Sequence, residues 1–113
     1  MNITMDDYQQ RAAKTAIYPG AGEPVGLCYT ALGLASEAGE VAGKIKKLIR
    51  DDRGVLDGQR RLAISREVGD VPWYCAMLAK ELGYTLGDVA ADNLDVLASR
   101  AERGKISGSG DNR

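Results

Sequence analysis

The chain contains no histidine, and this absence excludes several common kinds of active site. Ser-His-Asp and Cys-His nucleophile systems need an imidazole base. Catalytic zinc sites usually include histidine ligands, and di-iron carboxylate bundles place a Glu-x-x-His motif on two of their helices. Any hydrolysis by this chain must therefore depend on carboxylates, on lysines or on a metal-bound water.

Large apolar side chains are also scarce. The 113 residues include no phenylalanine and one tryptophan, and much of the apolar content is alanine. A single domain of this length is expected to bury about two thirds of the surface that its unfolded chain exposes. Because small side chains each bury little area, the core should be lean. We therefore expect association with further copies of the chain to supply additional burial.

The chain also lacks a large excess of either charge, a long apolar run and a high number of cysteines. A net charge of −1 provides no electrostatic footprint for nucleic acid or an anionic membrane. No apolar run approaches the length of a membrane span, and the N-terminus has no signal-peptide pattern. Cys28 and Cys75 are too few for a disulfide framework. We expect two free thiols in a reducing cytoplasm, with a disulfide between them as the alternative.

Apolar residues recurring at steps of three and four predict a chain of four helices. Their expected ranges are 4–17, 24–49, 59–82 and 85–101. Pro24 suits a first helical position, and Thr85 resembles the start of a capping box. Pro72 interrupts the third range and predicts a kink beside Asp70. Residues 105–113 are rich in Gly and Ser and are expected to form a flexible tail after a helical domain.

Two short acidic motifs are the most informative feature of the chain. Glu37-x-x-Glu40 lies on the second predicted helix and Glu67-x-x-Asp70 on the third, each beside an apolar stripe. Residues three apart are neighbours on a helix, and two helices joined by a short loop should pack as a hairpin. Carboxylates gathered in this way repel one another unless a cation lies among them, and they suit magnesium, calcium or manganese. The alternative is that both pairs are ordinary solvated acids.

Other side chains near these stripes are candidates for contacts with a ligand. Lys44 and Lys47 lie on the same side of their helix as the acids and suit phosphate contacts, although pairing with those acids is the simpler interpretation. Asn93 falls within an apolar stripe, where a buried amide needs hydrogen-bond partners from neighbours or from a ligand. Trp73 and Tyr74 suit stacking on a base, although packing in the core is favoured for both.

The spacing of Glu37, Glu40, Glu67 and Asp70 resembles the signature of the MazG-like, all-α nucleoside triphosphate pyrophosphohydrolases. The surrounding segments are similar to the two motif helices and the fourth helix of that family: LGLASEAGEVAGKIKKLIRD, EVGDVPWYCAMLAKELGYTL and NLDVLASRAERG. Further resemblance to its single-domain members lies in YQQRAAKTAIYP and ISGSGDNR. The likeness therefore spans nearly the whole chain.

This resemblance implies an all-α four-helix bundle, formed here by residues 1–104, that hydrolyses nucleoside triphosphates to a monophosphate and pyrophosphate. It implies magnesium as the cofactor, with manganese as an alternative. The same four acids would be the metal ligands and the catalytic residues, and Asn93 matches an asparagine associated with the nucleotide site in related proteins. Members of the family commonly form dimers or dimers of dimers, so a homodimer or homotetramer with a shared site is expected.

Two positions depart from the family pattern. Pro72 stands where similar chains mostly carry an aliphatic residue, and Val96 stands where a lysine is expected. The missing phosphate contact at Val96 leaves nearby basic residues, Arg103 among them, as replacements. The expected substrate-binding residues are Lys44, Lys47, Trp73, Asn93 and Arg100.

Two alternatives to a general triphosphate hydrolase remain open. One is a non-catalytic helical module that senses a nucleotide or binds a protein partner. The other is a narrower enzyme that acts on deoxynucleotides such as dUTP or dCTP, or on diphosphates. In either case we expect neither a nucleic acid polymer nor a membrane as a partner.

Overall fold

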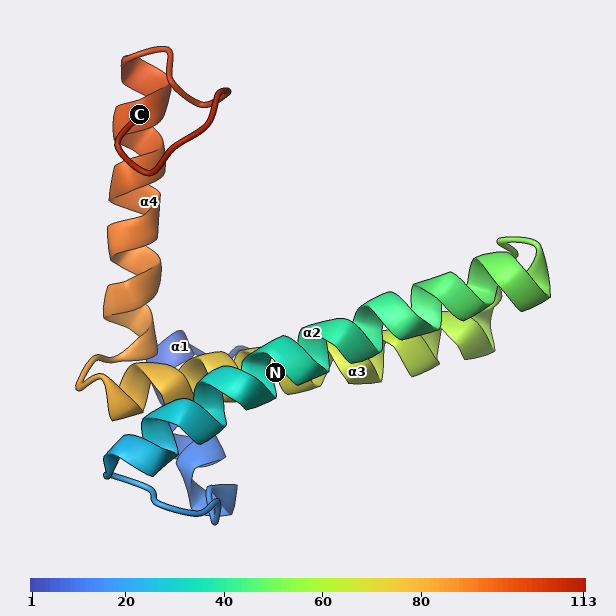
Figure 1. Cartoon of the computed structure of the whole chain (residues 1–113), viewed down its shortest axis with the longest axis horizontal. Coiled ribbons are helices and arrows are strands. Elements are labelled where there is room, and N and C mark those ends of the chain that lie inside the picture. The colour runs from blue at the N-terminus through green and yellow to red at the C-terminus, as the bar shows by residue number, and fades with distance from the viewer.

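The computed structural model describes residues 1–113 and is helical, without strands (Figure 1). Its elements are α1 (Met5–Ala12), the 3₁₀-helix η1 (Ala13–Thr15), α2 (Pro24–Asp52), α3 (Gly58–Glu81) and α4 (Leu86–Glu102). The predicted all-α class with four helices is confirmed. None of these helices combines the length and the apolar content that a membrane span requires.

Helix boundaries agree with the sequence except at the first helix. The expected range of 4–17 was wrong, because α1 ends at Ala12 and tightens into η1 before the chain leaves helical geometry at Ala16. Pro19 disfavours helical geometry for the residue that precedes it, so the helix does not resume. α3 continues through Pro72, which therefore removes one helical hydrogen bond without ending the helix.

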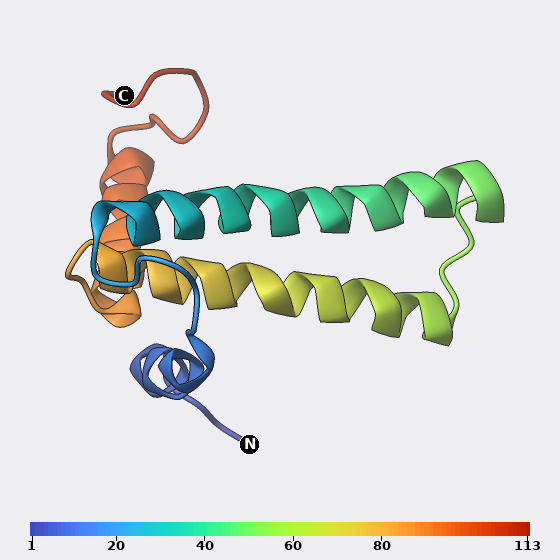
Figure 2. The ribbon, with the colours of Figure 1, turned by 60° about the horizontal axis from the view of Figure 1, so that its bottom comes forward.

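Helices α2 and α3 form a long antiparallel hairpin that dominates the molecule (Figure 2). Arg53 ends α2 with a left-handed φ of 57°, and the amide of Gly54 donates to the carbonyl of Leu48. Asp57 caps α3 by accepting from the amide of Arg60 at 2.8 Å. The guanidinium of Arg60 also donates to both Asp52 and Asp57 at 2.8 Å, which ties the far end of the hairpin together.

The core is small and lies where α1 packs on the C-terminal half of α3. Ala76 and Met77 are fully buried there beside Ala12 of α1. Only seven of the 113 residues are buried, so the lean core expected from the composition is present. Large apolar side chains remain exposed, for example Leu32 at 72% and Ile49 at 67%. The single chain therefore leaves much apolar surface uncovered.

The apolar stripe predicted on α2 is only partly buried. Leu34, Val41 and Leu48 are half-buried, whereas Leu27 and Ile45 are exposed. A single partner helix covers a narrow face of its neighbour, and α3 is the main partner of α2 within the chain. The remainder of the stripe needs another surface for burial.

Helix α4 leaves the end of the hairpin at a steep angle instead of packing along it (Figure 1). The buried side chain of Gln9 sets this direction, because its Nε2 donates to the carbonyls of Ala76 and Tyr84 at 3.0 and 3.2 Å. Its Oε1 accepts from the amide of Leu86 at 3.1 Å. Thr85 is the N-cap, as predicted, and accepts from the amide at position 88 at 3.0 Å.

The loop before α2 is fastened to α3 by the carboxylate of Glu81. The Tyr18 hydroxyl and the Gly22 amide both donate to this carboxylate, the latter at 3.1 Å. The Tyr18 ring also stacks on Tyr29, with centroids 5.6 Å apart. These hydrogen bonds, with that of Tyr18 first, lower the pKa of Glu81. Burial and the same carboxylate raise the pKa of Tyr18 to about 12.

We expect Glu81→Gln to lower the melting temperature at neutral pH, because a neutral amide accepts weaker hydrogen bonds than a carboxylate. Since the native pKa of Glu81 lies below its ordinary 4.5, its charged form contributes stability above that pH. This contribution is lost as the pH falls through the lowered pKa. Thermal melts across this range should show the difference between the two proteins shrinking in acid. A difference in melting temperature that stayed constant with pH would contradict this role. Glu23→Gln, which changes an exposed acid, is a suitable control.

Candidate metal centre

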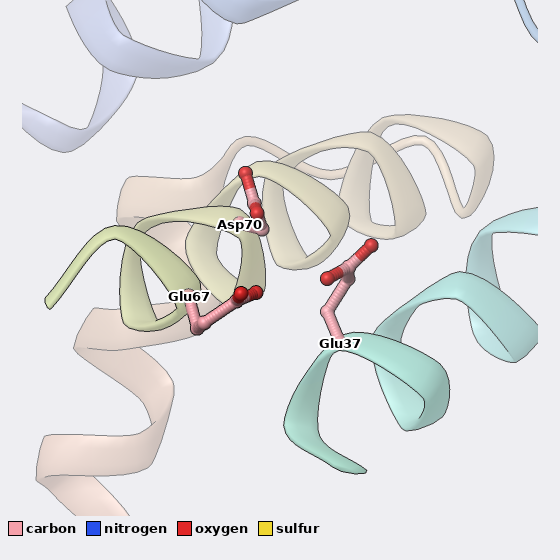
Figure 3. A group of neighbouring side chains, drawn as sticks. All are labelled: Glu37, Glu67 and Asp70. Atoms are coloured by element: carbon pink, nitrogen blue, oxygen red, sulfur yellow. The ribbon is translucent and has the colours of Figure 1, made fainter. Parts of the chain in front are cut away.

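Three of the four predicted acids meet where α2 and α3 face each other (Figure 3). Glu37 comes from α2, and Glu67 and Asp70 lie three residues apart on α3. One carboxylate oxygen from each residue lies within 4.8 Å of the other two. Glu37 and Glu67 are half-buried and Asp70 is exposed, so the group is open on one side.

The charges in this group repel one another with little relief from the protein. Partial burial, followed by the negative charges of Asp70, Glu67 and Glu40, raises the pKa of Glu37. No hydrogen-bond donor of the chain contacts the side chains of the three clustered acids. Lys44 provides the nearby positive charge, with its Nζ 3.9 Å from Oε1 of Glu67. A divalent cation among the three oxygens would remove this repulsion.

Glu40 does not belong to the three-acid group. It is exposed, and it is not among the residues whose carboxylate oxygens lie within 4.8 Å of one another. Its charge still contributes to the raised pKa of Glu37, so it lies at the margin of the site. The sequence predicted four clustered acids, and the structure brings three of them together.

The two candidate lysines of α2 occupy different surroundings. Lys44 reaches across the hairpin to Glu67 and thus borders the acids. Lys47 is exposed and makes no ion pair. Both lysines line, with Arg60 and Asp52, a cavity of about 190 Å³ between the two helices. Lys44 is therefore the lysine closer to a ligand held by the acids.

Two aromatic side chains follow the acids on α3. Trp73 is half-buried, donates from Nε1 to Thr15 at 3.0 Å, and meets the Tyr74 ring edge-on at 5.0 Å. Burial comes first among the causes that raise the pKa of Tyr74, and the charges of Glu37 and Asp70 add to it. Trp73 thus packs within the chain, while Tyr74 is the aromatic residue whose pKa is raised by the charges of the acids.

Sequence reasoning missed Tyr8 as a neighbour of the site. Burial raises the pKa of Tyr8, and the nearby charge of Asp70 raises it further. No periodic pattern pointed to this influence of Asp70 on Tyr8, because it depends on how α1 packs on α3. Tyr74 had a signal, since it follows Asp70 by four residues and so lies on the same face of α3.

The two candidates on α4 lie apart from this group in the single chain. Asn93 is exposed in the single chain. The reason is that α4 leads away from the hairpin, which also leaves Leu94 exposed at 66%. Arg100 lies nearly two further turns along the same helix.

Comparisons with known proteins identify a family and a relative. A model of the family described as "MazG nucleotide pyrophosphohydrolase domain" matches residues 29–104, which hold all four acids. The chain is 50% identical over 112 residues to the "Gene 37 protein" of Mycobacterium phage L5. This similarity covers 96% of the chain and 98% of the phage protein. No solved structure matches the chain.

Proposed function

Because the chain belongs to the MazG nucleotide pyrophosphohydrolase family, we propose that it hydrolyses a nucleoside triphosphate to a monophosphate and pyrophosphate. The observation that carries this proposal is the convergence of Glu37, Glu67 and Asp70, with one oxygen of each within 4.8 Å of the others. A purely structural role does not require three neighbouring carboxylates that accept no hydrogen bonds. A cation site does require such a group.

The three carboxylates suit Mg²⁺ as ligands, with Mn²⁺ as the alternative. Both are hard cations that prefer carboxylate oxygens, and Mg²⁺ usually keeps positions for water and substrate phosphates. The open side of the group at Asp70 leaves room for such ligands. When bound, the cation supplies neutralisation of the triphosphate charge and a water of lowered pKa.

The remaining residues of the site suggest how the chain itself contributes. Glu40 lies beside the group without being part of it, so it is the acid left to orient a water for in-line attack at the α-phosphorus and to accept its proton. Lys44 loses its ionic partner when Glu67 binds a cation, and its ammonium then becomes available to a phosphate oxygen. Tyr74 offers an aromatic surface beside the acids for the base.

We also propose that the working form is a homodimer or homotetramer. Asn93 and Arg100 lie on a helix that leads away from the acids of their own chain, so they reach nucleotide only at the site of another copy. The exposed apolar residues of α2 and α4 provide surface for that association.

A panel of ribo- and deoxynucleoside triphosphates, assayed with and without Mg²⁺, tests the reaction. We expect metal-dependent release of pyrophosphate and a monophosphate in equal amounts, resolved by anion-exchange chromatography. Release of phosphate and a diphosphate would contradict the proposed cleavage. Tight nucleotide binding without turnover would instead identify a sensor, and turnover of deoxynucleotides alone would identify the narrower enzyme.

A further inference from the structure

The loop between η1 and α2 is connected to the surroundings of the acids by four aromatic side chains, called here the aromatic row: Tyr29, Tyr18, Trp73 and Tyr74. Tyr18 of the loop stacks on Tyr29 of α2, with centroids 5.6 Å apart and ring planes 9° from parallel. It also meets Trp73 edge-on at 6.4 Å, and Trp73 meets Tyr74 edge-on at 5.0 Å. Aromatic rings prefer stacked and edge-to-face pairs at such separations. Ring contacts therefore continue from the loop to Tyr74, whose pKa the acids help to raise.

The loop end of the aromatic row is fastened by Glu81, near the end of α3. Its carboxylate accepts from the Tyr18 hydroxyl and from the amide of Gly22, the latter at 3.1 Å. The loop backbone also lies close against the start of α2. A Cβ built at Gly26 would lie 2.3 Å from the carbonyl oxygen of Gly20 and 2.9 Å from Oε1 of Glu81. The loop that carries Tyr18 is thus held by both α2 and α3.

The other end of the row is confined by the helix pair. The Tyr74 ring lies against Gly33 of α2, where a Cβ would come within 2.1 Å of Cε1 of the ring. Burial comes first among the causes that raise the pKa of Tyr74, and the neighbouring Tyr29 is the next. Trp73 is anchored separately, because its Nε1 donates to the hydroxyl of Thr15 at 3.0 Å. Neighbours on several sides therefore restrict the Tyr74 ring.

We propose, on the basis of the proposed function, that Tyr18 is a positioning residue for the nucleotide. Fastened by Glu81, it holds the aromatic row so that Tyr74 presents its ring to the base. The fastening point lies away from the acids, because Glu81 follows Asp70 by eleven residues on α3, or about 16 Å of helix. Contiguous packed side chains can carry such an influence over this distance. A contact group that is held in place before the ligand arrives lowers the ordering cost of binding.

Tyr18→Phe tests this role, because it removes the hydroxyl that reaches Glu81 and keeps the ring. For the triphosphate with the highest kcat/KM, we expect KM to rise about fivefold or more, with kcat within about twofold of the unmodified chain. The affinity for Mn²⁺ should not change, because the acids are untouched. Assays well below the melting temperature of each variant separate this effect from instability. Tyr84→Phe, which changes a tyrosine that is 61% exposed and outside the row, is the matched control.

A double-mutant cycle distinguishes positioning from a purely structural role. Tyr74→Leu removes the ring that Tyr18 is proposed to hold, so adding Tyr18→Phe to this variant should leave KM unchanged. The melting temperature should still fall, because the hydrogen bond to Glu81 is lost in both backgrounds. An unchanged KM in Tyr18→Phe alone, or additive effects of the two substitutions on KM, would overturn the proposal.

Binding without turnover separates this inference from the proposed hydrolysis. Equilibrium dialysis against the α,β-imido analogues of the four deoxynucleoside triphosphates, in the presence of Mn²⁺, measures affinity directly. Tyr18-dependent binding of an analogue by a chain that hydrolyses no triphosphate would refute the hydrolysis and support the positioning role. Hydrolysis with equal KM in the unmodified chain and in Tyr18→Phe would do the reverse. The absence of both binding and hydrolysis would overturn both.

Discussion

Glu67→Gln and Asp70→Asn are each expected to lower kcat/KM for pyrophosphate release by about a thousandfold or more. Each substitution removes a charged ligand from the group of oxygens that lie within 4.8 Å of one another. Neither side chain accepts a hydrogen bond from the chain, so the fold should persist. The loss of one negative charge should also relieve the repulsion that raises the pKa of Glu37.

The measurement is steady-state release of pyrophosphate, together with thermal melts in the absence of divalent cations. Melting temperatures of both variants should equal or exceed that of the unmodified chain, because each loses repulsion among the acids, and the 3.9 Å pair with the exposed Lys44 that Glu67→Gln also loses contributes little. Glu102→Gln, an exposed acid at the end of α4, is the control and should leave activity unchanged. Full activity in a folded Glu67→Gln variant would eliminate the proposed metal site.

Glu40→Gln should separate the two roles of the acids. Because Glu40 lies outside the three-acid group, its substitution should lower kcat while the affinity for Mn²⁺ stays close to that of the unmodified chain. Glu67→Gln should lower both kcat and the affinity for Mn²⁺. Metal affinity can be followed by titration with Mn²⁺, and an equal loss of affinity in both variants would place Glu40 among the ligands.

Gly33→Ala is expected to destabilise the hairpin by about 1–3 kcal/mol. A Cβ at this position would lie 2.1 Å from Cε1 of the Tyr74 ring, which is far closer than atoms pack. The ring has little freedom to retreat, since it is half-buried and packs against Trp73 at 5.0 Å. Its displacement should also lower activity, because Tyr74 lies beside Glu37 and Asp70.

Gly39→Ala provides a matched control on the same helix. Nothing lies within 4 Å of a Cβ built at Gly39, so alanine there should stabilise the helix by about 0.5–1 kcal/mol. Urea unfolding of both variants gives the two free energies of unfolding. If the Tyr74 ring is the cause, Tyr74→Ala should remove most of the difference between Gly33→Ala and the unmodified residue. Equal stability of the two glycine variants would contradict the close approach at Gly33.

The last three helices, the starts of α2 and α4 and the pairing of the two acids on α3 were predictable from the sequence alone. Pro24 and Thr85 begin their helices as expected, and the three-residue spacing of Glu67 and Asp70 places both on one face of α3. These features depend on contacts within a turn or two of the chain, which periodicity and capping preferences describe directly. A short connection between two long helices then makes an antiparallel hairpin the expected arrangement.

Only the tertiary structure decided four other features. They are the direction of α4, the exposure of Asn93, the place of Glu40 at the margin of the site and the influence of Asp70 on Tyr8. α4 takes its direction from Gln9, whose hydrogen bonds join residues 67 and 77 positions apart in the sequence. Such contacts depend on how whole helices pack, and no local pattern encodes them. The sequence by itself therefore determined which residues are candidates for the chemistry on each helix, and the packing of those helices decided which of them meet.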